Sequence, residues 1–210
     1  KNRIVRYVRK LIESADSIYD VSDIMTAPFE RIPITQFGDY SRAFVKIQDG
    51  CSRACSYCVI PSVRGPSRSQ NQETVFSDIQ RLIENGFREI VLTGIDLGAY
   101  GLDLEPITNL VNLLSVLESF EKLTRIRLSS IEPMEMTQAL IEKITGSRRV
   151  CRHFHIPMQS GSNRILRLMN RTYSREDCRH IIQSIKDRSP DACIGTDVIV
   201  GFPGESDCDF

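Results

Sequence analysis

The chain has 210 residues, of which 41% are apolar and 26% are charged, so its composition is that of one or two soluble globular domains. Lys plus Arg and Asp plus Glu each number 27, and the resulting net charge of zero excludes binding of nucleic acid through overall charge. No apolar run is long enough to span a bilayer and no signal-peptide pattern opens the chain, so we expect a soluble, cytoplasmic protein with no membrane partner. The sequence indicates no particular oligomeric state.

The first segment, residues 1–25, has the pattern of an amphipathic helix with a basic opposite face. Its apolar positions recur at helical spacing: Ile4, Val5, Val8, Leu11 and Ile12. We interpret the basic face as a solvated surface of a packed helix. Residues 26–41 contain Pro28, Pro33 and Gly38 without a sustained period and are expected to be a linker, followed by a core domain over residues 42–210.

Strands and helices alternate from residue 42 onward. Apolar and β-branched runs predict strands at 42–48, 89–93, 124–129, 153–158 and 193–200. Helical spacing and end signals predict helices at 75–83, at 107–117 opened by Pro106, at 136–145, at 162–169, and after the capping box of Ser174 and Asp177. Such alternation predicts an α/β fold with a parallel sheet and helices outside it. Ligands of such folds bind at the carboxyl ends of the strands.

Three of the seven cysteines, Cys51, Cys55 and Cys58, lie close together just after the first predicted strand. Iron–sulfur clusters are held by cysteine thiolates, normally four of them, so three closely spaced thiolates leave one iron open to a small ligand. A zinc site completed by His153, His155 or a fourth cysteine is the alternative, although the paired C-x2-C spacing of zinc sites is absent.

The C-x3-C-x2-C spacing, with the aromatic Tyr57 before the third cysteine, resembles the signature of radical S-adenosylmethionine enzymes. The resemblance implies a partial (β/α)6-type TIM barrel, of which five strands are covered. It also implies a [4Fe–4S] cluster on the three cysteines and S-adenosyl-L-methionine chelated to the fourth iron. In that reading Tyr57 lies against the adenine. The other cofactor-binding candidates follow the later strands: Gly94, Ser130, Glu132, Gln159, Ser160 and Gly201.

Longer sequence motifs of the chain resemble those of the methylthiotransferases, which insert a sulfur and a methyl group into tRNA or a ribosomal protein. These motifs include Lys46–Cys51, Leu128–Pro133, His153–Pro157 and Asp197–Glu205. Two of them, Ile-Gln-Asp-Gly-Cys and Ser-Ser-Ile-Glu-Pro, most resemble the branch that acts on N6-threonylcarbamoyladenosine at position 37 of tRNA. Isopentenyladenosine in tRNA or a ribosomal-protein aspartate is the alternative substrate.

The resemblance also implies partners beyond these residues. It implies an upstream domain, with residues 1–25 as its helical tail, that holds a second [4Fe–4S] cluster. It implies the anticodon loop of tRNA as substrate and a flavodoxin or ferredoxin as electron donor. It further implies that the fragment is incomplete, because a sixth strand and an RNA-binding domain would follow it. Asp96 is a further candidate for a polar contact to cofactor or substrate. A zinc-binding structural module remains the rival class, and it would be indifferent to S-adenosylmethionine.

Overall fold

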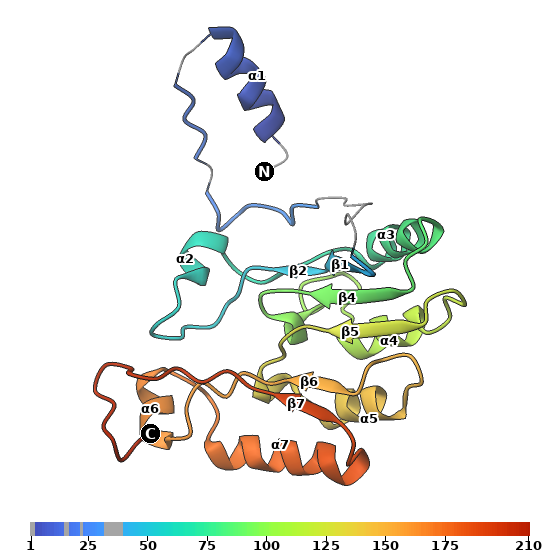
Figure 1. Cartoon of the computed structure of the whole chain (residues 1–210). Coiled ribbons are helices and arrows are strands. Elements are labelled where there is room, and N and C mark those ends of the chain that lie inside the picture. Colours follow the sequence, from blue (N-terminus) through green and yellow to red (C-terminus); the bar gives the residue numbers. More distant parts are fainter. Residues whose placement is uncertain (1–2, 15–16, 22, 32–39) are drawn as a thin grey trace.

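The computed structural model describes residues 3–14, 17–21, 23–31 and 40–210 (Figure 1). Five parallel strands carry the fold: β1 (Arg42–Lys46), β4 (Glu89–Thr93), β5 (Arg125–Leu128), β6 (His153–His155) and β7 (Cys193–Gly195). Four longer helices connect them: α3 (Gln72–Glu84), α4 (Leu110–Leu117), α5 (Gln138–Gly146) and α7 (Arg175–Arg188). The predicted α/β class with parallel strands is therefore confirmed.

The strands form two parallel sheets rather than one. The first has the order β1-β4-β5, and the second consists of β6 and β7. They are linked by a bridge between Ile126 and Val150 and by a hydrogen bond of 3.0 Å from the Ile131 amide to the His155 carbonyl. Among the described residues the strands do not close into a barrel. The parallel arrangement expected of a partial barrel is confirmed, and its single continuous sheet is not seen.

The burial of each strand follows its place in the sheet. β4 is the central strand of its sheet, and its consecutive residues Ile90, Val91 and Leu92 are all buried, as expected for a strand covered on both faces. In the edge strand β5 only Ile126 and Leu128 are buried, in the alternating pattern of a half-exposed strand.

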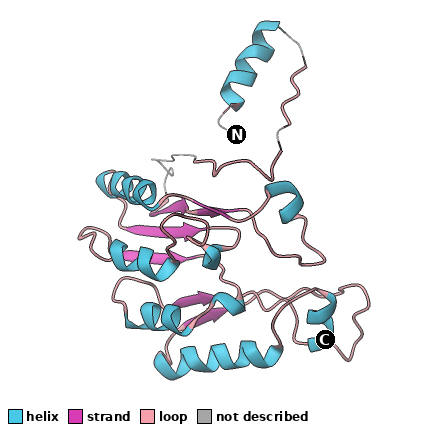
Figure 2. Cartoon of the chain, turned by 180° about the vertical axis from the view of Figure 1, so that it is seen from behind, coloured by secondary structure: helices cyan, strands magenta, loops and turns pink. Residues whose placement is uncertain are grey.

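The helices α3, α4, α5 and α7 follow one another along the outer side of the strands (Figure 2). Their apolar faces enter one continuous core with the strands. The predicted capping box at the start of α7 is confirmed, because the Ser174 hydroxyl and the Asp177 carboxylate each accept a hydrogen bond from the other's backbone N–H. The carboxyl ends of the strands lie together on the side that also carries the short helices α2 (Ile60–Arg64) and α6 (Asn163–Leu168) (Figure 1).

Several predicted boundaries were wrong. Pro106 does not open a helix, because Asn109 caps α4 and its side chain accepts the Asn112 amide at 2.9 Å, leaving Ile107 exposed. β6 ends before Pro157, which has no N–H to donate to a strand ladder. β7 ends at Gly195, and only an isolated bridge, from Gln159 to Val198, continues the pairing.

The predicted amino-terminal helix is confirmed as α1 (Ile4–Ser14). None of its residues is buried, so the expected packing of its apolar face is not seen among the described residues. The expected linker lies partly outside the described residues, at 32–39. The residues around its start contact the core, because the Arg68 guanidinium donates to the carbonyls of Ile24, in the preceding segment, and of Ala27 at 3.2 and 2.8 Å, and Arg31 pairs with Asp78. Two short 3-10 turns, η1 (Leu97–Ala99) and η2 (Pro133–Glu135), follow β4 and β5. None of the described helices is long and apolar enough to cross a membrane.

Candidate functional site

The cysteine loop begins and ends in a small antiparallel strand pair that the sequence did not predict. β2 (Gln48–Asp49) precedes the loop and pairs with β3 (Arg68–Ser69), which follows it. Gly50 has a φ of +74°, and a Cβ at this position would lie 2.1 Å from the Pro66 carbonyl oxygen. The two ends of the loop therefore approach each other as closely as glycine permits.

Buried Gln48 connects this loop to the end of β4. Its side-chain amide nitrogen donates to the Gly50 carbonyl at 2.8 Å and to the Ser67 hydroxyl at 2.9 Å. Its side-chain oxygen accepts the Asp96 amide at 2.7 Å. Predicted site residue Gly94 packs against this side chain, since a Cβ there would lie 2.8 Å from the Gln48 oxygen. Gly94 thus admits the side chain that holds the start of the cysteine loop.

Cys51 lies in an acidic and half-buried environment. Its thiol donates to Asp96 at 3.5 Å, and burial raises the pKa of this thiol to about 12. Arg53 donates to Asp96 at 3.3 Å and forms an ion pair with Glu135 in η2. Burial, and then the nearby Asp96 charge, raise the pKa of Glu135 to about 7.

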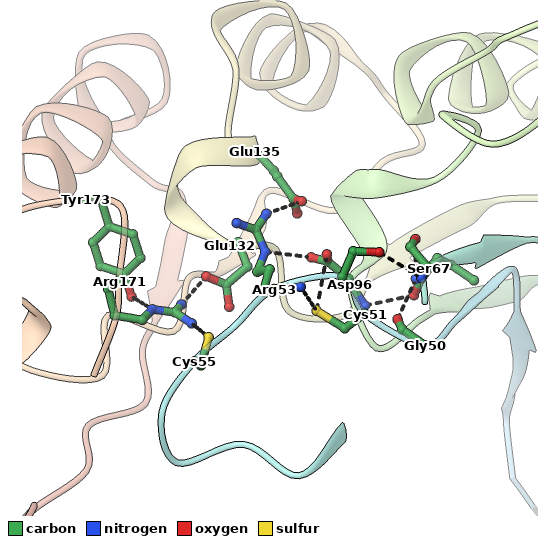
Figure 3. A network of polar contacts seen from close by, with 12 residues as sticks. Gly50, Cys51, Arg53, Cys55, Ser67, Asp96, Glu132, Glu135, Arg171 and Tyr173 are labelled. Carbon is green, nitrogen blue, oxygen red and sulfur yellow. Dashed lines mark hydrogen bonds and ion pairs between the residues drawn. The ribbon is translucent and has the colours of Figure 1, made fainter. Parts of the chain in front are cut away.

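Arg171 lies at the centre of a second set of polar contacts, which surrounds Cys55 as the first surrounds Cys51 (Figure 3). Its guanidinium donates to the Cys55 sulfur at 2.9 Å, to the Tyr173 hydroxyl at 2.9 Å and to the Tyr57 hydroxyl at 3.4 Å, and it forms an ion pair with Glu132. Burial disfavours the charged guanidinium and is the largest single effect, but Glu132, Tyr173 and Tyr57 together outweigh it, and the pKa of Arg171 is raised. The site therefore brings together predicted residues from the cysteine loop and from the end of β5.

The cysteine loop also contacts the carboxyl end of α6 and the two segments that follow α6 and β7. The Ser56 hydroxyl donates to the Leu168 carbonyl at 2.9 Å, and the Asn170 side chain donates to the Ala54 carbonyl at 2.7 Å. The Tyr57 ring lies edge-on to Phe202, with centroids 6.5 Å apart. Burial raises the pKa of the Tyr57 hydroxyl to about 12, so it stays protonated at neutral pH.

The remaining predicted residues lie at strand ends with other partners. Gly201, next to Phe202, has a φ of +78°, and its amide donates to the Glu205 carboxylate at 2.5 Å. The Ser130 hydroxyl contacts the His155 ring at 3.2 Å. Gln159 has a φ of +68°, and the buried Ser160 hydroxyl accepts the Ser162 amide at 3.1 Å. No hydrogen bond described for Ser130, Gln159 or Ser160 reaches the cysteine loop.

A cavity of about 260 Å³ opens beside Cys55. It is lined by Ser52, Arg53, Ala54, Cys55, Glu132, Asn170, Arg171, Thr172 and Tyr173. A thiol, two guanidinium groups and a carboxylate therefore face one space. Such a lining suits a small polar ligand that carries both charge signs.

Sequence reasoning missed Arg53, Glu135 and Arg171. Arg171 follows the short helix α6 and Asn170, whose φ of +58° turns the chain back toward the cysteine loop. No spacing signal connects it to cysteines more than a hundred residues upstream. Outside the cysteine loop, Cys178 is buried, whereas Cys193 is exposed.

The donor set fits an iron–sulfur cluster. Cys51, Cys55 and Cys58 are free and half-buried, and they share one loop. Among the residues that the structure describes, no three His, Cys, Asp or Glu side chains converge on a point where one metal ion would bind. The irons of a cluster are bound by separate thiolates, which need not meet at one point.

A family model described as the radical SAM superfamily matches residues 45–210. The chain belongs to the radical SAM superfamily. This membership implies a [4Fe–4S] cluster and S-adenosylmethionine, and it replaces the alternative of a zinc-binding structural module.

Curated relatives of this radical SAM chain carry the names of tRNA-modifying enzymes. A "tRNA-2-methylthio-N(6)-dimethylallyladenosine synthase" of Pelotomaculum thermopropionicum is 44% identical over 169 residues, which are 80% of this chain and 38% of the relative. The "Threonylcarbamoyladenosine tRNA methylthiotransferase MtaB" of Bacillus subtilis is 40% identical over 212 residues, which cover 100% of this chain and 47% of the relative. The chain thus spans less than half the length of these two relatives.

Solved structures support the fold. The radical S-adenosylmethionine methyltransferase TsrM of Kitasatospora setae, solved with a tryptophan substrate and an S-adenosylmethionine analogue, aligns with a TM-score of 0.57 at 16% identity. The alignment covers 75% of this chain and 30% of TsrM.

Proposed function

We propose that Cys51, Cys55 and Cys58 bind a [4Fe–4S] cluster and that the surrounding strand ends bind S-adenosylmethionine. The observation that carries this proposal is the placement of three half-buried thiols on one closed loop at the carboxyl ends of the parallel strands. When bound, the cluster supplies the single electron that cleaves the sulfonium of S-adenosylmethionine. A sixth strand from outside the chain would extend the two sheets toward the expected barrel.

The chain's own residues would hold the cofactor in place. Tyr57 presents its ring next to Phe202, and this pair offers an apolar surface to an adenine. The Glu132 carboxylate lies beside the cavity at Cys55, where it would attract the ammonium group of the cofactor. Gly94, Ser130, Gln159, Ser160 and Gly201 complete the proposed binding residues at the other strand ends.

The reaction we propose is methylthiolation of tRNA at N6-threonylcarbamoyladenosine 37. Two observations support it: the sequence motifs around Gln48 and Ser130, and the 40% identity to the Bacillus subtilis relative. Dimethylallyladenosine in tRNA is the competing substrate, because it appears in the name of the Pelotomaculum relative. The proposal includes a second [4Fe–4S] cluster as sulfur source and a flavodoxin or ferredoxin as electron donor, both outside these residues.

Anaerobic reconstitution with iron and sulfide tests the cluster. We expect reduced protein to give an EPR signal of a [4Fe–4S] cluster that changes when S-adenosylmethionine is added. Cys55→Ala should lose the signal, and Cys151→Ala, which removes an equally half-buried thiol outside the site, should retain it. A Cys55→Ala protein with full iron content and an unchanged signal would refute the ligand assignment.

The substrate is tested separately in cells. Mass spectrometry of tRNA nucleosides from a strain deleted for the gene should show loss of the methylthio group from threonylcarbamoyladenosine. Loss from dimethylallyladenosine instead would assign the protein to the other branch.

A further inference from the structure

Arg171 is the most enclosed charged group at the candidate site. Only 3% of its side chain is exposed, although the segment that carries it follows an exposed helix end. A guanidinium in such a place must be paired and hydrogen-bonded, because leaving it without partners would cost several kcal/mol. Its donors are distributed over one carboxylate, two phenol oxygens and one sulfur.

The sulfur contact is the unusual one. One terminal nitrogen of Arg171 lies 2.9 Å from the Cys55 sulfur, which is short for a donor to sulfur. The other terminal nitrogen pairs with Glu132 (Figure 3). The same fork therefore connects a proposed cluster ligand with a carboxylate at the end of β5.

Tyr173 fixes the orientation of this fork. Its hydroxyl accepts the Arg171 Nε–H at 2.9 Å and shares its one proton between the Pro157 and Met158 carbonyls, both at 3.1 Å. The ring is buried, and the guanidinium lies 4.9 Å from its centroid. Arg171 thus has little freedom to turn away from Cys55, so the N–H···S contact is a fixed feature of the site.

We infer that Arg171 is a positioning residue that raises the reduction potential of the cluster through its hydrogen bond to Cys55, and that Glu132 opposes it. The inference rests on the proposed function, because it requires a cluster on Cys55. Reduction adds one electron, and hence negative charge, to the cluster and its thiolates. Hydrogen bonds to the sulfurs and nearby positive charge stabilise that state, whereas a nearby carboxylate destabilises it.

The two residues therefore predict shifts of opposite sign. Arg171→Gln removes the positive charge and weakens the hydrogen bond to sulfur, so its cluster should be harder to reduce. Glu132→Gln removes the negative charge and leaves the guanidinium more available to Cys55, so its cluster should be easier to reduce. A residue that only held the fold together would give no such pair of opposite shifts.

The experiment is a redox titration of the anaerobically reconstituted chain, followed by EPR, in the absence of S-adenosylmethionine. Dithionite supplies the electron. We expect Arg171→Gln to lower the equilibrium constant of reduction by about tenfold, which is a shift of about 59 mV for one electron. Arg167→Gln removes the same charge from an exposed position one turn earlier and should leave the potential unchanged.

The outcomes separate the inference from the proposed function. Wild-type protein without a cluster would refute both. Arg171→Gln with full iron content and the wild-type potential would overturn the inference and leave the cluster assignment intact. If Arg171→Gln fails to hold iron, Glu132→Gln decides: a more positive potential supports the inference, and an unchanged or more negative potential overturns it.

Discussion

Gly50 gives a sharp test of how the cysteine loop is closed. In Gly50→Ala the added methyl would lie 2.1 Å from the Pro66 carbonyl oxygen and 2.7 Å from that of Gly65, at a φ of +74°. Gly86→Ala is the matched control, because Gly86 also has a positive φ, +96°, but has no atom within 4 Å of the added Cβ.

The difference between the two variants follows from these contacts. Both incur the left-handed backbone cost of a non-glycine residue, about 1–2 kcal/mol. Gly50→Ala also incurs overpacking against rigid backbone, about 1–3 kcal/mol. It further weakens the hydrogen bond of 3.0 Å from the Cys51 amide to Gly65, a loss of about 1 kcal/mol. Gly50→Ala should therefore be destabilised by about 2–4 kcal/mol more than Gly86→Ala.

Urea unfolding of the metal-free proteins measures this difference, and iron content after reconstitution measures its effect on the loop. We expect Gly50→Ala to retain less iron than Gly86→Ala. Equal destabilisation of the two variants would show that the loop ends are not held as closely as the structure places them.

Three further predictions concern stability. Because the folded pKa of Glu135, about 7, lies above the ordinary glutamate value of 4.5, wild-type stability should fall as pH rises from about 5 to about 8. Glu135→Gln should remove up to about 3 kcal/mol of that fall in urea unfolding. Ser174→Ala removes the capping box of α7 and should lower the free energy of unfolding by about 1 kcal/mol. Leu113→Ala leaves a cavity at a fully buried position of α4 and should cost about 2–5 kcal/mol, seen as a lower thermal midpoint.

Controls distinguish these effects from general damage. A Glu135→Gln protein whose stability falls with pH as steeply as that of wild type would contradict the assigned titration. Ser115→Ala, an exposed serine inside α4, should cost less than Ser174→Ala, and the reverse order would contradict the capping argument. Val116→Ala, at an exposed position of the same helix, is the comparison for Leu113→Ala.

The sequence predicted those parts of the fold that depend on local patterns. The five strands, the order of helices and the capping box of Ser174 could be read from it, because periodicity and end signals act within a few residues. The lengths of the strands predicted at 153–158 and 193–200 were overestimated, since Pro157 interrupts the strand ladder in a way that apolar composition does not reveal. Beyond it, the pairing continues only in the isolated bridge from Gln159 to Val198. Pro106 misled because Asn109, a stronger cap, begins the helix instead.

The site was only partly predictable for the same reason. The spacing of the cysteines predicts them as cluster ligands, and the family resemblance predicts cofactor-binding residues after each strand. No local sequence pattern predicts Arg171 or Glu135, because their roles at the site come from contacts with residues far away in the sequence. Their roles depend on burial and on opposite charges, which appear only when the chain is folded.

The short β2–β3 pair has a consequence for how the loop acquires its metal. Joining the two ends of a flexible loop costs conformational entropy that grows with its length. Here the β2–β3 pairing and the contacts of Gln48 join the ends through protein groups alone, none of which is a proposed cluster ligand. The entropy of closure is thus lost when the protein folds, so cluster insertion has only the segment between Cys51 and Cys58 left to order.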